Sequence, residues 1–295
     1  MIGHLPPYRV EAVAHALPSS GVDWSLSAYG IPALWSQHQG AGVRVAILDS
    51  GIEPGHPAME GAVKEHRNFT TDCSPYDTNG HGTHVAGVLA GRGSMRGVAP
   101  QAELLSFKVL NNNGAGSLQH VTQAIHAAIE AKANIIVMSL GCPVSVPYLQ
   151  EACANAAEQG IAVVCAAGND GGSVNYPAAY GSVIAVGAVD QDGQVCEFSC
   201  RGREIAVAAP GYQITSAWLG GKYATLSGTS MAAPFVAGVL ALHAGKCGTA
   251  GLAQKASKIL RETSTDAGDP GKDGMYGWGL INPTSLVGNG CRVIV

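Results

Sequence analysis

Three polar residues of this sequence belong to the types that together can activate a hydroxyl for attack on an acyl group. Asp49 follows the apolar run VRVAIL, His81 follows a glycine in NGHGTH, and Ser230 lies in SGTSMAAP before a long apolar segment. A serine hydroxyl is a weak nucleophile until a base removes its proton, and a histidine base is oriented by a carboxylate. The combination predicts nucleophilic acyl transfer, with Asp49, His81 and Ser230 as the catalytic residues.

Asn169, at the end of the apolar run in CAAGND, is a fourth candidate for the same chemistry. Acyl transfer develops negative charge on an oxygen, and a side-chain amide aimed at that oxygen contributes ~3–4 kcal/mol to the transition state. Ser230 opens a predicted helix, where free amide groups and the helix dipole also favour negative charge. We therefore expect Asn169 and the amide of Ser230 to form an oxyanion hole.

Each of these residues has a simpler explanation when it is taken alone. An aspartate after a strand can cap a turn, and a serine before an apolar helix can cap that helix. His81 and His84 lie about one helical turn apart and would suit a metal, although the sequence lacks the His-Glu-x-x-His pattern there. The three residue types together favour acyl transfer.

Apolar runs and amphipathic stretches alternate along the chain, and these elements must position the polar residues. The runs are VRVAIL (43–48), NIIVMSL (134–140), IAVVCAAG (161–168) and VIAVGAV (183–189). Strands apolar on both faces are typical of a parallel sheet covered by helices, which we expect over 117–132 and 147–160. YQITSAW and GKYATLSG predict a hairpin closed by Gly220 and Gly221. The alternation predicts a single α/β domain with a doubly wound, mostly parallel sheet and chemistry at the carboxyl ends of the strands.

The composition excludes several classes of partner. The 295 residues are 46% hydrophobic and 13% charged, with a net charge of −4 that comes from scattered residues. No basic stripe suits nucleic acid and no polybasic segment suits a membrane surface. No apolar run approaches the ~20 residues of a membrane span, and the N-terminus lacks the apolar block of a secretory signal. We therefore expect a cytoplasmic protein whose eight cysteines are reduced thiols.

The motifs in their order along the chain resemble the subtilisin-like serine proteases. DSGI, HGTHVAG, MSLG, AAGN and GTSMAAP appear in that family's order, and the resemblance covers roughly residues 30–245. The resemblance implies the subtilisin-like fold, a serine endopeptidase acting on polypeptides, the triad Asp49, His81 and Ser230, and Asn169 in the oxyanion hole.

The same resemblance implies two extended segments that hold the substrate backbone, and a specificity pocket beside them. The implied substrate-binding residues are Gly114, Ala115, Gly116 and Leu118 on one side, Ser139, Leu140 and Gly141 on the other, and Ala166, Gly168, Asp170 and Asn175 around the pocket. Main-chain pairing of this kind is nearly independent of substrate sequence. Asp170 is expected at the rim of the pocket and Asn175 near its base, with ordinary loop roles as the alternative.

One feature of many subtilisins is expected to be lost, namely the strong calcium site. Ala58, in GHPAM, stands where the family has a ligating aspartate, and the loop over 90–97 is too short to carry the remaining ligands. Calcium requires several oxygen ligands, and Arg92 and Arg96 disfavour a dication. A weak structural cation is conceivable near Glu204, but we expect no required cofactor and no metal.

The N-terminal stretch HLPPY, residues 4–8, resembles the short extension of the intracellular subtilisins, which are the nearest resemblance within the family. Two prolines remove two amide donors and make the stretch stiff and extended. We expect residues 1–20 to be an inhibitory extension that lies across the active site through Leu5, Pro6, Pro7 and Tyr8, and 21–295 to be the catalytic domain. Maturation is expected between Tyr8 and about Leu26. A homodimer is conceivable by resemblance, but the part after about residue 250 matches the family less well.

Two other functions remain open from sequence. A dedicated maturase could cut one peptide precursor or transfer its acyl group to an amine with the same residues. A peptide-binding module on an inactive protease fold would lack a member of the triad, and Asp49, His81 and Ser230 are all present.

Overall fold

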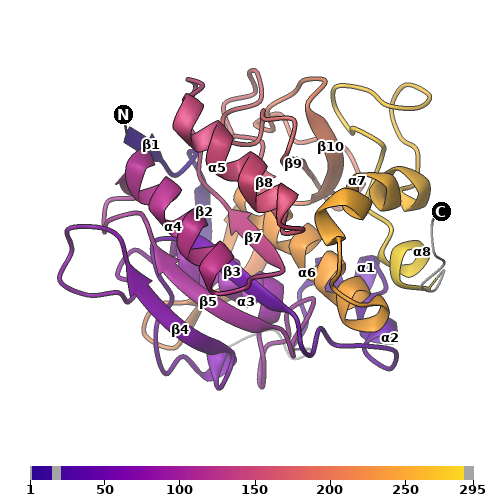
Figure 1. Cartoon of the computed structure of the whole chain (residues 1–295). Coiled ribbons are helices and arrows are strands. Elements are labelled where there is room, and N and C mark those ends of the chain that lie inside the picture. The colour runs from indigo at the N-terminus through magenta and orange to yellow at the C-terminus, as the bar shows by residue number, and fades with distance from the viewer. Residues whose placement is uncertain (1, 15–20, 289–295) are drawn as a thin grey trace.

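In residues 2–14 and 21–288, the part of the chain that the computed structural model describes, seven parallel strands form the central sheet (Figure 1). They are β3 (Arg44–Asp49), β4 (Val63–Asn68), β5 (Glu103–Lys108), β7 (Ile135–Met138), β8 (Ala162–Ala166), β9 (Ile184–Val189) and β10 (Ile205–Pro210). Their order across the sheet is β10-β9-β8-β7-β3-β5-β4, with parallel pairing throughout. The predicted α/β fold is confirmed.

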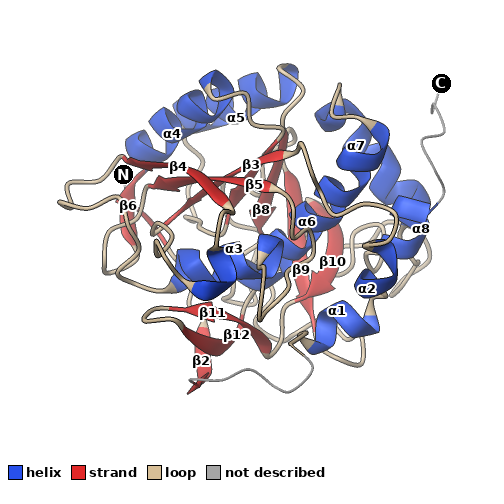
Figure 2. Cartoon of the chain, turned by 90° about the horizontal axis from the view of Figure 1, so that it is seen from below, coloured by secondary structure: helices blue, strands red, loops and turns tan. Residues whose placement is uncertain are grey.

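Alternate residues of the strands pack into two separate cores, one on each face of the sheet. Val45 and Ile47 of β3 face the core that contains α3 (His81–Ala90) and α6 (Thr229–Cys247), whereas Ala46 and Leu48 face α4 (Leu118–Glu130) and α5 (Pro147–Glu158). Figure 2 shows the two helix layers on opposite sides of the sheet. Because both faces are covered, every side chain of β3 after Arg44 is buried.

Helix α6 runs through the larger core. It is apolar on all sides, as a fully enclosed helix is expected to be, and its residues from Thr229 to Leu242 are buried. By length and composition alone, α6 is the one helix among the described residues that could cross a membrane, so the expectation that no apolar segment is long enough is wrong. Its burial inside the domain identifies it as a core helix.

The other helices lie around this framework. They are α1 (Trp24–Ala28), α2 (Ile31–Leu34), a 3₁₀ turn (Pro57–Met59), α7 (Leu252–Thr263) and α8 (Pro283–Gly288). Helix α7 packs against α5, β8 and β10, and α8 packs against α2, α6 and α7. Helices α1, α2, α7 and α8 close the end of the molecule away from the N-terminus (Figure 1), whereas the 3₁₀ turn packs against α3.

Two small antiparallel sheets include the N-terminal residues. β1 (Ile2–His4) pairs with β6 (Ala115–Ser117), and β2 (Arg9–Ala14) pairs with β12 (Lys222–Ser227). β12 also pairs with β11 (Ile214–Trp218) in the predicted hairpin, where Gly220 and Gly221 adopt positive φ angles of 73° and 68°. Residues 2–14 are thus joined to the rest of the fold through two strands, one on either side of the prolines.

The expected elements match those observed within a few residues, but three strands of the central sheet were not among them. The four apolar runs form β3, β7, β8 and β9, and the two amphipathic stretches form α4 and α5. The strands β4, β5 and β10 were not expected; β4 has the polar sequence VKEHRN, because it lies at the sheet edge and its side chains are only partly buried.

The expectation that all eight cysteines are reduced thiols is wrong. Cys247 is disulfide-bonded, whereas the thiols of Cys73, Cys142, Cys153, Cys165, Cys196 and Cys200 are free.

Candidate active site

The carboxyl end of β3 and the start of α3 bring an aspartate and a histidine into contact. The chain enters the sheet at β3, adds β4 and β5 on one side, and then continues with β7 on the other. This reversal creates a crevice at the carboxyl ends of the strands. Asp49 ends β3 and His81 begins α3, with His81 Nδ1 2.8 Å from Asp49 Oδ1 and 3.0 Å from Oδ2. Both side chains are buried, so this hydrogen bond fixes the orientation of the imidazole.

A buried aspartate that the sequence reading missed joins the two elements. Asp77 accepts hydrogen bonds from the Ser50 hydroxyl (2.9 Å), from the Gly80 amide (3.0 Å), and from the amide and hydroxyl of Thr83 (2.9 and 2.6 Å). Ser50 Oγ in turn accepts from the Gly82 amide (2.9 Å). Asp77 therefore connects the residue that follows Asp49 with the first turn of α3. Asp77 lies three residues before Gly80, the N-cap of α3, so the helix-cap pattern does not identify it, and DTNG indicates only a turn.

Close packing at the junction of β3 and α3 explains why residue 82 is a glycine. A Cβ at Gly82 would lie 2.1 Å from the carbonyl oxygen of Gly51 and 3.2 Å from Asp49 Cβ. A side chain at residue 82 would push α3 away from β3, and with it His81 from Asp49.

The start of α6 carries Ser230 and is connected to two strand ends. Asn169 Oδ1 accepts from the amide (2.8 Å) and hydroxyl (2.7 Å) of Thr229, and the Ser139 hydroxyl donates to the Ser230 carbonyl (2.9 Å). Because Thr229 occupies the Asn169 oxygen, the Asn169 amide nitrogen is the group that faces the crevice. Ser230 follows the first residue of α6 and is buried.

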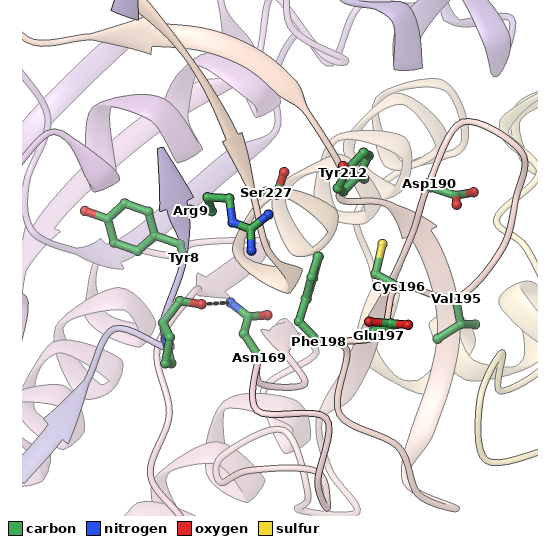
Figure 3. A pocket seen from close by; sticks show the side chains of 11 residues that line it. Tyr8, Arg9, Asn169, Asp190, Val195, Cys196, Glu197, Phe198, Tyr212 and Ser227 are labelled. Carbon is green, nitrogen blue, oxygen red and sulfur yellow. Dashed lines mark hydrogen bonds between the residues drawn. The ribbon is translucent and has the colours of Figure 1, made fainter. Parts of the chain in front are cut away.

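The N-terminal segment occupies the crevice. Asn169 Nδ2 donates to the Pro7 carbonyl oxygen (2.9 Å), the contact drawn as a dashed line in Figure 3. The Tyr8 ring lies 4.9 Å from the His81 ring between centroids, and its hydroxyl donates to Asn79 Oδ1 (3.4 Å). Burial raises the pKa of Tyr8, as do the charges of Asp49 and Asp77. The segment thus covers the histidine and contacts the predicted oxyanion donor.

Upstream of the prolines, the segment is held between two extended segments of the domain. Leu5 N donates to the Gly114 carbonyl (2.9 Å), and His4 exchanges hydrogen bonds with Gly141 (3.2 and 3.0 Å). Ala115 and Gly116 pair with His4 and Gly3. Leu118 is buried beneath this ladder, since a Cβ at Gly3 would lie 2.9 Å from its Cδ2.

The residues expected to line a pocket lie next to this strand. Asn175 stands between the two expected walls, because added Cβ atoms at Gly141 and Gly168 would lie 3.2 Å and 2.3 Å from its side chain. Ser139, Leu140 and Ala166 are buried in the same walls. Asp170 is exposed, and a hydrogen bond from the Cys200 thiol (2.7 Å) lowers the pKa of its carboxyl group. The structure therefore places the expected residues together, while their roles stay predictions.

Downstream of Pro7, a cavity of about 640 Å³ opens beside Asn169. Figure 3 shows the aromatic rings of Phe198 and Tyr212 and the carboxylates of Asp190 and Glu197 around it. Cys196 also lines the cavity, but burial, aided by the charge of Asp190, raises the pKa of its thiol to about 12. The Cys196 thiol is therefore protonated at neutral pH and unsuited to act as a nucleophile.

The histidine pair is not arranged as a metal site. His84 Nε2 lies 3.1 Å from the Ile214 carbonyl and 3.0 Å from the Ala224 carbonyl, so His84 donates to the β11–β12 hairpin. Burial, and secondarily His81, lowers the pKa of His84 to about 3, so its ring is neutral. Within the described residues no group of three or more histidine, cysteine or acidic side chains could hold a metal ion.

Ala58 and Arg92, two of the residues expected to disfavour calcium, are in contact. Ala58 is buried, and its carbonyl oxygen accepts a hydrogen bond from the amide of Arg92 (2.8 Å). The guanidinium of Arg92 donates to the Ala102 carbonyl (2.7 Å) in the same region. The Ala58 methyl group offers no oxygen ligand and the Arg92 guanidinium is a cation, so the loss of the calcium site stays a prediction.

A doubly wound sheet that brings a buried Asp–His pair, a serine at a helix start and an asparagine amide to one crevice defines a serine hydrolase of the Asp-His-Ser type. The chain belongs to the subtilase family, whose model ("Subtilase family") matches residues 40–279.

Individual relatives agree with this assignment. The chain is 45% identical to an intracellular serine protease of Paenibacillus polymyxa over 81% of its own length and 77% of the relative's. It is also 45% identical to the major intracellular serine protease of Bacillus subtilis (72% and 71% covered), and 41% identical to subtilisin E of Bacillus subtilis (92% and 72% covered). The predicted resemblance is confirmed, and the protein is a subtilisin-like serine endopeptidase.

Proposed function

We propose that this protein hydrolyses peptide bonds of polypeptides through Asp49, His81 and Ser230, and that residues 4–8 hold it latent until they are removed. The observation that carries the proposal is the hydrogen bond from Asn169 Nδ2 to the Pro7 carbonyl, because it puts the chain's own peptide where a substrate carbonyl would bind. The names of two relatives include "intracellular", which supports a cytoplasmic location.

The proposed reaction follows from the positions of four groups. His81 Nε2 takes the proton of Ser230 Oγ as the oxygen attacks the carbonyl carbon, and Asp49 stabilises the resulting imidazolium through Nδ1. The Asn169 amide and the Ser230 N–H donate to the oxyanion. Breakdown returns the proton to the leaving amine and leaves an acyl-enzyme, which water then hydrolyses by the same steps in reverse.

Contacts of the bound segment support latency. His81 Nε2 and Ser230 Oγ are buried, and neither has a hydrogen-bond partner among the described residues, so base and nucleophile are not engaged with each other. Tyr8 packs against the His81 ring. Pro6 and Pro7 have no N–H to donate, so this stretch of the peptide is held by its flanks and by the Pro7 carbonyl.

The test compares initial rates. Freshly purified full-length protein, with its N-terminus verified intact by mass spectrometry, should hydrolyse casein only after a lag, and added active enzyme should shorten that lag. A variant lacking residues 1–20 should act without a lag. Equal initial rates with an intact N-terminus would contradict latency. Of the interval from Tyr8 to about Leu26 in which the maturation cut is expected, residues 15–20 lie outside the described residues, and they include most of ALPSSG at 16–21.

A further inference from the structure

We propose that β12 (Lys222–Ser227) is a binding site for the polypeptide strand that follows the scissile bond, and that it pairs with the second to the seventh residue beyond that bond. The inference rests on the proposed function, because it treats the N-terminal segment as a bound substrate mimic. Its basis is the β2–β12 ladder, which lies apart from the contacts of residues 4–8 with the crevice.

The register gives the extent of the site. Because Asn169 holds the Pro7 carbonyl, the Pro7–Tyr8 bond corresponds to the bond that would be cut. Arg9 is then the second residue after the bond, and it pairs with Ser227. Ala14 is the seventh, and it pairs with Tyr223. The ladder is longer than the one upstream, where β1 and β6 pair over three residues.

The pairing depends on the main chain. All six side chains of β2 are exposed, with Val10 at 45% and Val13 at 50% of their maximum. A register shift between Thr225 and Leu226 accommodates Glu11, whose carboxylate accepts from the Ser227 hydroxyl (3.1 Å). The small role of side chains defines the ligand as an extended polypeptide of varied sequence, recognised by strand addition.

Removal of residues 1–20 would leave the site available. In the three-stranded sheet β11-β12-β2, β12 has β11 on one side and β2 on the other. Without β2, its main-chain groups on that side have no strand partner, which is the condition for pairing with another chain. The mature enzyme would then bind unfolded segments in preference to short peptides or folded loops.

Peptides of graded length test the site. A recognition sequence for a site-specific protease is placed within residues 15–20 of the full-length protein. The protein is folded first and cut at this sequence afterwards. Internally quenched peptides share one upstream half and extend two, four, seven or ten residues beyond the scissile bond. We expect kcat/KM to rise at least tenfold from two to seven residues and to stay level from seven to ten, because each main-chain hydrogen bond contributes about two- to tenfold.

A second series separates main-chain pairing from non-specific contact. The fifth to seventh positions correspond to Ala12, Val13 and Ala14, which pair in regular register with Thr225, Ala224 and Tyr223. Along one strand of an antiparallel ladder, every second residue directs its N–H toward the partner strand. N-methylation should therefore be harmful either at the sixth residue alone or at the fifth and seventh residues, and should have little effect at the others. The harmful methylations should lower kcat/KM about two- to tenfold, while changing these side chains between alanine, threonine and glutamine should have little effect.

The outcomes distinguish the inference from the proposed function. If the cut protein cleaves the two-residue peptide but shows no further gain beyond the third residue, the β12 site is wrong and latency stands. If cutting produces no increase in rate on any peptide, the proposed latency fails and the inference fails with it.

Discussion

Ser230 and Asn169 show how single residues depend on their neighbours, because Thr229 and Ser139 orient the groups around them. Ser230→Ala should leave the fold unchanged and lower peptidase activity by several orders of magnitude, since the members of a triad act as a unit. The measurement is kcat/KM of the processed protein on casein or a peptide, with circular dichroism as the check on folding. Retention of even a tenth of the activity would exclude Ser230 as the nucleophile.

His84 gives a second prediction for a single residue, concerning stability. Its pKa is lowered to about 3 in the folded protein, whereas an unfolded chain binds the proton below about 6.5. The unfolded state therefore binds more protons between these values, and the contribution of neutral His84 is complete above pH 6.5 and lost as the pH falls toward 3. His84→Gln retains a side-chain N–H group without the titration, so its free energy of unfolding in urea should fall less steeply from pH 6.5 to 4. Parallel pH profiles would contradict this account.

The junction of β3 and α3 is the point where two elements must be positioned together. Asp77 accepts hydrogen bonds from Ser50, Gly80 and Thr83, and an asparagine there would turn one acceptor into a donor that faces other donors. We expect Asp77→Asn to cost about 1–3 kcal/mol in the free energy of unfolding. Because the Asp49–His81 geometry depends on this junction, kcat/KM should fall as well. Asp192→Asn, at an exposed position, is the matched control and should change neither quantity. A stable Asp77→Asn variant with full activity would show that the junction does not need the carboxylate.

For the whole molecule, we predict that thermal stability does not depend on a tightly bound calcium ion. Ala58 and Arg92 occupy the region where many subtilisins bind the ion, and the Ala58 carbonyl is already hydrogen-bonded. Thermal melts of the protein in EDTA and in millimolar calcium should therefore have nearly the same midpoint. A tightly bound ion would raise the midpoint by several degrees through mass action, and a shift of that size would show that other residues form a site.

The sequence by itself determined the features that depend on local pattern. Apolar runs identified β3, β7, β8 and β9, and the motifs around Asp49, His81, Ser230 and Asn169 identified the family, because both signals lie within short stretches of chain. The tertiary structure alone decided the order of strands across the sheet and the position of the polar edge strand β4. It also decided the role of Asp77 and the pairing of β1 with β6 and of β2 with β12, on either side of the expected crossing of the active site. These features arise from pairing and hydrogen bonds between residues far apart in the chain, and no local periodicity records which distant partner each group will find.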